Sequence, residues 1–134
     1  MSHFIDLFSN GVKNYILNVI GNKRPKKILI CMIYFPDEMM TGGWADTTLN
    51  FLSYNDNPQK LQTAIRKMFE YATSKIKING TEIIPVPMYE MMNGKHSNDY
   101  VDRVEPSSIG GAKLASGFVD LCFNKTRHFA IRRK

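Results

Sequence analysis

The sequence has little cysteine and no apolar run long enough to cross a membrane. Cys31 and Cys122 are the only cysteines among 134 residues, and each lies in a short apolar stretch. Secreted domains held together by disulfides carry more cysteines at closer spacing, so we interpret both as reduced core thiols of a cytoplasmic protein. A transmembrane helix needs about 20 consecutive apolar residues, so no membrane partner is expected. The first residues also lack the pattern of a secretory signal.

The motifs of several common enzyme classes are also missing. The sequence has no Gly-x-Ser-x-Gly nucleophile elbow, no phosphate-binding glycine loop and no Cys-x-x-Cys pair. Its histidines are isolated, and a single histidine such as His96 without a second ligand at suitable spacing is a poor metal site. We therefore expect no cofactor and no metal.

Basic residues outnumber acidic ones by 18 to 12, which gives a net charge of +6. Much of the excess is local, because one basic cluster lies at residues 23–27 and another at the C-terminus, Arg127 and residues 132–134. A nucleic-acid-binding face would interleave basic residues with exposed aromatics, which neither cluster does. Nucleic acid is therefore not an expected partner. A basic nucleic-acid module, whose attraction to polyanions would weaken with salt, stays an alternative to the two functions considered below.

Apolar spacing along the chain predicts a single α/β domain over residues 1–134. Helical periodicity covers residues 4–20 and 58–76, and a last helix opens at Pro106-Ser107-Ser108 with an apolar face of Ile109, Ala112, Ala115, Phe118, Val119 and Cys122. Strands are expected at residues 28–35 and 82–87. The first of these is apolar without alternation, which is typical of a parallel strand covered on both faces. Helices alternating with strands predict a parallel sheet between helical layers.

Two secure strands are few for a sheet that stands alone. Residues 37–57 read as turns around a short apolar piece at 49–52, which we expect either to add a strand or to leave the sheet incomplete. An incomplete sheet would be finished by another copy of the chain or by a missing segment, because an open strand edge invites pairing. A homo-oligomer, and most simply a dimer, is the expected partner.

Ligands of parallel sheets bind beyond the carboxyl ends of the strands, here residues 34–46 and 88–107. Asp99, Asp102 and Glu105 lie three residues apart in the second segment, and a helical turn would place them on one face. Two close carboxylates raise one pKa, which suits a general acid and base or a hard metal. The alternative is a solvated acidic loop near the positive end of the last helix. Trp44 and His96 are further ligand-binding candidates in these segments, although Trp44 is equally suited to packing.

Residues 102–115 resemble the last conserved block of the SGNH (GDSL-type) hydrolases, Asp-x-x-His-Pro-Ser-x-x-Gly-x-x-x-x-Ala. The order of helices and strands before it is similar to the C-terminal half of that family's fold. The resemblance implies a three-layer α/β/α, flavodoxin-like half-domain with a short parallel sheet. It therefore allows residues 1–134 to be the C-terminal part of a larger domain. A glycine early in the last helix, Gly110 or Gly111, is expected to allow close packing on the sheet.

The same resemblance implies an esterase-like ancestry with a small ester as substrate, and Asp102 matches the family's catalytic aspartate. Two departures stand against activity. Glu105 occupies the position of the histidine, and no Gly-Asp-Ser motif supplies a nucleophile. A carboxylate is a weak base toward a serine hydroxyl. We therefore expect a catalytically incomplete chain, and the alternative is a non-catalytic assembly or ligand-binding protein on the same scaffold.

Overall fold

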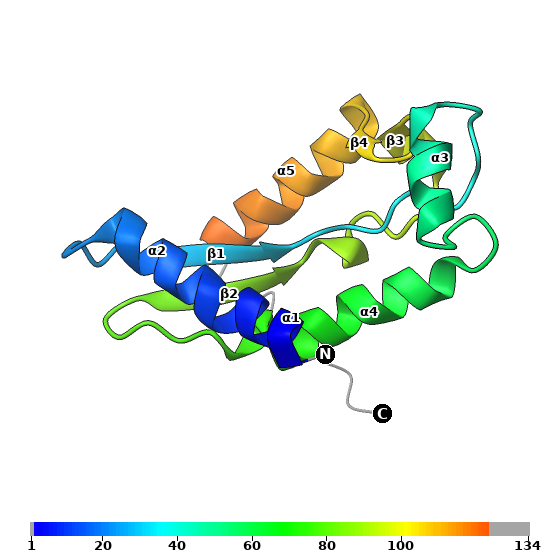
Figure 1. Cartoon of the computed structure of the whole chain (residues 1–134). Coiled ribbons are helices and arrows are strands. Elements are labelled where there is room, and N and C mark those ends of the chain that lie inside the picture. Colours follow the sequence, from blue (N-terminus) through cyan, green and yellow to red (C-terminus); the bar gives the residue numbers. More distant parts are fainter. Residues whose placement is uncertain (1, 124–134) are drawn as a thin grey trace. The chain divides into compact units, whose positions relative to one another are not determined.

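The computed structural model describes residues 2–123 (Figure 1), and the chain divides into two compact units by its internal contacts. The first unit comprises Met1–Met32 and Gln62–Val86, and the second comprises Ile33–Leu61 and Pro87–Lys134. His128 and the basic cluster at the C-terminus lie outside the described residues. The molecule mixes helices with a short parallel two-stranded sheet, so its class is α/β.

The first unit begins with the expected N-terminal helix, which is interrupted by a π-helical turn. Helix α1 (Ser2–Asp6) continues through η1 (Leu7–Gly11) into α2 (Val12–Ile20). The helix ends at Gly21, whose φ of 56° is readily adopted only by glycine. No residue of η1 or α2 is buried, so this helix leaves apolar side chains at the surface.

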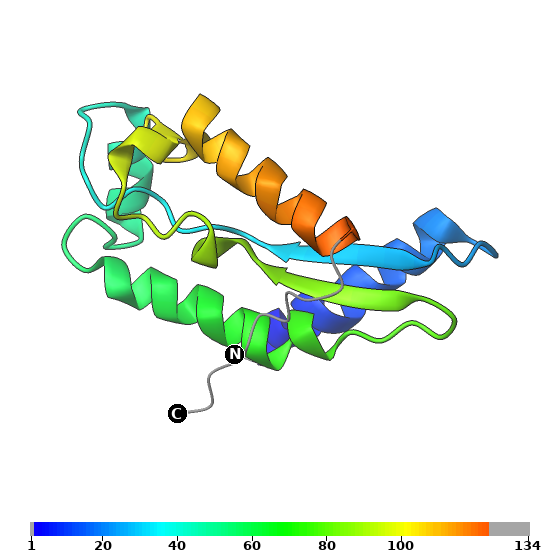
Figure 2. The ribbon, with the colours of Figure 1, turned by 180° about the vertical axis from the view of Figure 1, so that it is seen from behind.

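Strands β1 (Lys27–Met32) and β2 (Glu82–Pro87) run side by side in the same direction (Figures 1 and 2). Strand β2 has the predicted bounds, but β1 ends three residues before Phe35 and is not covered on both faces. Ile30 and Met32 are buried, and the alternation of a strand turns Cys31 to the exposed side. Ile33 beyond the strand is 55 % exposed. The interpretation of Cys31 and Cys122 as core thiols is therefore wrong, because both residues are exposed.

Helix α4 (Pro58–Tyr71) begins at the predicted proline and is followed by a 3-10 turn, η2 (Thr73–Lys75). Proline suits the first helical position because its missing N–H has no partner there in any case. The helix belongs to both units, since the boundary falls between Leu61 and Gln62. The first unit buries apolar residues from its strands, from α4 and from the chain that follows α4: Ile30, Met32, Phe69, Ala72, Ile76, Ile78 and Val86.

The second unit contains a helix that the sequence did not predict, α3 (Trp44–Phe51). No strand forms at residues 49–52, because Leu49 and Phe51 belong to α3 and Leu52 caps it. Ala45, Leu49 and Tyr54 form a buried cluster, against which Leu61 and Val104 pack. The remaining elements are η3 (Met88–Glu90), η4 (Ser97–Asp99), β3 (Tyr100–Val101), β4 (Glu105–Pro106) and α5 (Ser108–Phe123).

Helix α5 begins where the sequence predicts, but it packs through another face. The Ser107 hydroxyl accepts hydrogen bonds from the N–H groups of Ile109 and Gly110 and so caps the helix. Ile109 and Val119 of the predicted apolar face are more than half exposed. The buried positions are Gly110, Gly117 and Leu121. Among the described residues no helix is both long and apolar enough to cross a membrane.

Candidate functional site

The three acidic residues of the predicted cluster do not share one helical face: Asp99 ends η4, and Asp102 and Glu105 lie on the tight hairpin that follows it. Strands β3 and β4 pair antiparallel, with Val101 opposite Glu105. The reversal between them places Asp102 and Arg103 at φ values of 43° and 72°, a left-handed conformation that is uncommon outside glycine. The prediction of a shared helical face for Asp99, Asp102 and Glu105 is therefore wrong. The spacing of three reflects a turn, which sends successive side chains in different directions.

Each acid has a separate environment. Asp99 is only 2 % exposed, and its carboxylate accepts a hydrogen bond from the Lys113 ammonium at 2.7 Å. Glu105 is exposed on β4. The Asp102 carboxylate accepts a hydrogen bond from the Thr41 hydroxyl at 2.7 Å and lies directly against Gly43, where any Cβ would overlap it. Asp99 thus forms an ion pair with Lys113, and Asp102 connects the hairpin to the segment before α3 through its hydrogen bond with Thr41.

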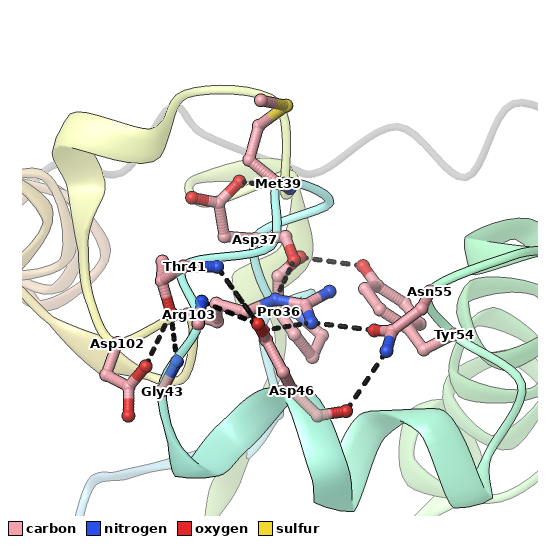
Figure 3. A network of polar contacts seen from close by, with 11 residues as sticks. Pro36, Asp37, Met39, Thr41, Gly43, Asp46, Tyr54, Asn55, Asp102 and Arg103 are labelled. Carbon is pink, nitrogen blue, oxygen red and sulfur yellow. Dashed lines mark hydrogen bonds and ion pairs between the residues drawn. The ribbon is translucent and has the colours of Figure 1, made fainter.

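The centre of the second unit is Arg103, which is fully buried (Figure 3). Its Nε donates to the carbonyl oxygen of Asp37 at 3.1 Å. Its Nη1 donates to the side-chain oxygens of Asp46 and Asn55, each at 2.7 Å. The guanidinium also lies 5.8 Å from the centre of the Tyr54 ring, within the range of a cation–π contact. Its Nη2 has no hydrogen-bond partner.

Asp46 joins Arg103 to the turn that precedes α3. Its carboxylate accepts hydrogen bonds from the N–H of Gly42 at 2.7 Å and from the N–H of Thr41 at 3.2 Å. Burial acts to raise the pKa of Asp46, but the bond from Arg103 and the two backbone donors outweigh it and hold that pKa below its ordinary value. Asp46 is therefore an ionised, hydrogen-bonded anchor.

Two tyrosines hold the chain that follows β1. Tyr100 donates to the carbonyl oxygen of Phe35 at 2.8 Å and accepts from the N–H of Gly94 at 2.9 Å. Tyr54 donates to the carbonyl oxygen of Pro36 at 2.7 Å. Gly94 has a φ of 81°, and a Cβ there would overlap the Pro36 oxygen. Burial raises the pKa of Tyr100, which keeps its hydroxyl protonated as a donor.

The two remaining predicted site residues stand at the periphery. Trp44 is the first residue of α3 and is 60 % exposed, so it does not pack in the core. His96 is exposed in the loop before η4. Within residues 2–123 no group of three histidine, cysteine, aspartate or glutamate side chains is arranged to hold a metal ion. Trp44, His96 and Asp99 therefore have different surroundings, since Trp44 and His96 are exposed and Asp99 is buried.

A groove of about 780 Å³ runs along α5 in the same unit. Its wall combines charged and hydroxyl side chains with apolar ones: Glu90, Met91, Ser108, Ile109, Ala112, Lys113, Ser116 and Gly117. Desolvation raises the pKa of Glu90. Lys113 connects the groove to the buried carboxylate of Asp99. Sequence reasoning missed this groove, since Ser116 and Gly117 give no apolar periodicity.

Comparisons of the chain with protein-family models, with curated proteins and with solved structures gave no match. The SGNH-type resemblance thus stays a prediction from the residues themselves.

Proposed function

We propose that this chain is a catalytically incomplete, SGNH-type half-domain that does not hydrolyse esters by itself. The observation that supports it most strongly is the separation of the two acids that match the family's aspartate and histidine. The carboxylate of Asp102 accepts a hydrogen bond from the Thr41 hydroxyl and lies against Gly43, whereas Glu105 lies exposed on β4. A general base has to reach its nucleophile within hydrogen-bond distance. The arrangement instead serves to hold loops together around Arg103.

The test is hydrolysis of p-nitrophenyl acetate, a small ester of the class that the resemblance implies. We expect a rate equal to that of buffer for the wild-type chain, for Asp102→Ala and for Glu105→Ala. Glu105→His restores the family's base, and we expect it to remain inactive because a nucleophile is still missing. Turnover that appears in Glu105→His, or wild-type turnover that is lost when Thr41 or a serine is replaced, would contradict the proposal.

A second candidate function, binding of a small molecule, is favoured by the groove along α5. Its volume of about 780 Å³ is within the range of ligand sites. Lys113, although paired with Asp99, keeps two further N–H donors beside apolar Ile109. A short-chain carboxylate such as butyrate matches that combination. We expect butyrate to raise the melting temperature of the wild-type chain but not of Ser116→Trp, which fills the groove. Butyramide, which has the same length without the charge, is the matched probe, and equal effects of both compounds would argue against a role for Lys113.

A further inference from the structure

Within residues 2–123, the N-terminal helix of the first unit exposes several apolar side chains. Phe4 is 56 % exposed, Tyr15 71 % and Val19 67 %, and Leu7 and Phe8 on the same helix are also exposed. Phe4 and Phe8 are four residues apart, and so are Tyr15 and Val19 beyond the π-helical turn η1, so the members of each pair lie next to each other on the helix surface. Isolated apolar residues at a surface are ordinary, but a row of them along one helix indicates an interaction face. We call these five residues the apolar row.

The chain immediately after this helix is strongly basic. Residues 1–27 contain five lysines and arginines and one aspartate, so they carry +4 of the chain's net +6. Lys23, Arg24 and Lys26 are exposed in the loop between α2 and β1. Arg24 donates from Nη1 to the carbonyl oxygens of Gly21 and Lys23, both at 2.8 Å, which fixes the loop against the helix end.

A hollow of about 440 Å³ joins the apolar row to the basic loop. It is lined by Val19, Ile20, Lys23, Arg24 and Pro25, and so by apolar side chains on one side and cations on the other. An occupant that suits such a lining has an anionic group attached to an apolar body. That is the chemistry of an anionic lipid at the edge of a membrane.

We propose that the apolar row and the basic loop bind the surface of an anionic membrane, with the helix lying in the plane of the interface. Charge favours this occupant over a second copy of the chain, because the copy would present the same +4 to this face. No membrane partner is predicted from the sequence, because the chain lacks a spanning run. A helix that lies in the interface needs an apolar face and nearby cations, and it needs no spanning run.

The experiment is flotation of the full chain with vesicles of phosphatidylcholine alone or with about 30% phosphatidylserine. We expect partitioning at least about tenfold stronger onto the anionic vesicles, and we expect it to weaken as salt is raised. Lys23→Glu with Lys26→Glu removes two cations from the loop while keeping the hydrogen bonds of Arg24. Its matched control, Lys60→Glu with Lys67→Glu on α4, changes the net charge equally. We expect at least about tenfold weaker partitioning for the first pair than for the control.

The apolar row is tested separately, because any basic protein adsorbs weakly to anionic vesicles. Phe4→Ser with Tyr15→Ser replaces exposed side chains, and the melting temperature verifies that the fold survives. We expect at least about tenfold weaker partitioning, and we expect no change for Ile109→Ser with Val119→Ser, which are similarly exposed on α5. The proposal is overturned if anionic vesicles do not bind the wild-type chain, or if each pair behaves like its control. It is also overturned if the chain is a dimer that Phe4→Ser with Tyr15→Ser converts to monomer without any vesicle binding.

Discussion

Arg103 illustrates how much a single buried charge can organise. It has no exposed surface, and its partners Asp37, Asp46 and Asn55 come from segments far from it in the sequence. Arg103→Ala leaves the Asp46 carboxylate without its cation. Removal of one partner from a buried ion pair typically costs about 3–5 kcal/mol. We therefore expect a loss of that order in the free energy of unfolding, measured by urea denaturation.

A double variant distinguishes the pair from simple loss of packing. Arg103→Met with Asp46→Leu removes both charges and keeps apolar volume, so it should be less destabilising than Arg103→Ala alone. Lys67→Ala on the exposed side of α4 is the surface control and should change stability by less than about 0.5 kcal/mol. If Arg103→Ala were as stable as that control, the network in Figure 3 would not hold the second unit together.

The lowered pKa of Asp46 predicts a defined dependence of stability on pH. A carboxyl group whose pKa is lower in the folded than in the unfolded chain stabilises the fold when both forms are ionised. This contribution is complete above the ordinary value of 3.8 and is lost as the pH falls from there through the lower folded pKa. We expect Asp46→Asn to flatten the decline of unfolding free energy in that range, measured by urea denaturation at stepped pH. Parallel curves for variant and wild type would show that another group is responsible.

The residues of this network show where sequence reasoning stops. Asp102 and Asp99 were predicted as site residues and do lie in the second unit, but their roles follow from a turn that no helical spacing describes. Arg103 was overlooked between them. Its bonds to Asp46 and Asn55 span 57 and 48 positions in the sequence. A local pattern favours an exposed arginine in such a polar segment, since arginine is rarely buried without partners that only the fold can bring.

At the scale of elements, α5 packs through glycine where the sequence suggested large apolar side chains. A Cβ at Gly110 would overlap the carbonyl oxygen of Asp99, whereas a Cβ at Gly111 would meet nothing within 4 Å. The two neighbours thus form a matched pair. We expect Gly110→Ala to destabilise the chain by about 1–3 kcal/mol through overpacking. Gly111→Ala should stabilise it by up to about 1 kcal/mol, because alanine favours a helix interior.

Thermal denaturation of both variants checks this prediction. The structure itself corrects part of the expectation that residues 102–115 suggested for these glycines. Close packing on the sheet was expected at Gly110 or Gly111, but the close approach is at Gly110 alone and is to the backbone of Asp99 in η4. Equal melting temperatures for the two variants would mean that η4 and α5 are not in contact as closely as their backbones indicate.

The elements that sequence predicted well are those with strong local signals. Helix α4 has a proline at its first position and a clear apolar period, and β2 has a short apolar run. Helix α3 was missed because it has only eight residues and contains Thr47 and Thr48, which have a low helix propensity. Its stability comes from the burial of Ala45 and Leu49 against Tyr54, which a local window does not contain.

At the scale of the whole molecule, the open question is how the sheet of the first unit is completed. Strands β1 and β2 have only each other as neighbours among the described residues, so each has an outer edge. Two-stranded sheets are rarely stable without further strands or extensive cover. The exposed thiol of Cys31 and the exposed side chain of Ile33, two positions further on, show that one face of the chain at β1 is also open. A second copy paired through β1 would satisfy the backbone groups along this edge.

We therefore predict that the chain forms a symmetric dimer through β1, with the Cys31 residues of the two copies close together. Sedimentation at micromolar concentration should give twice the mass of the chain, and the melting temperature should rise with concentration because dissociation accompanies unfolding. Mild oxidation with diamide should crosslink the wild type and Cys122→Ser, but not Cys31→Ser. The two cysteines are a matched pair, since both are exposed and neither forms a disulfide within the chain. A monomer whose melting temperature does not change with concentration would contradict this dimer. A crosslink that requires Cys122 would also contradict it, and either result would leave the edge of β1 unpaired.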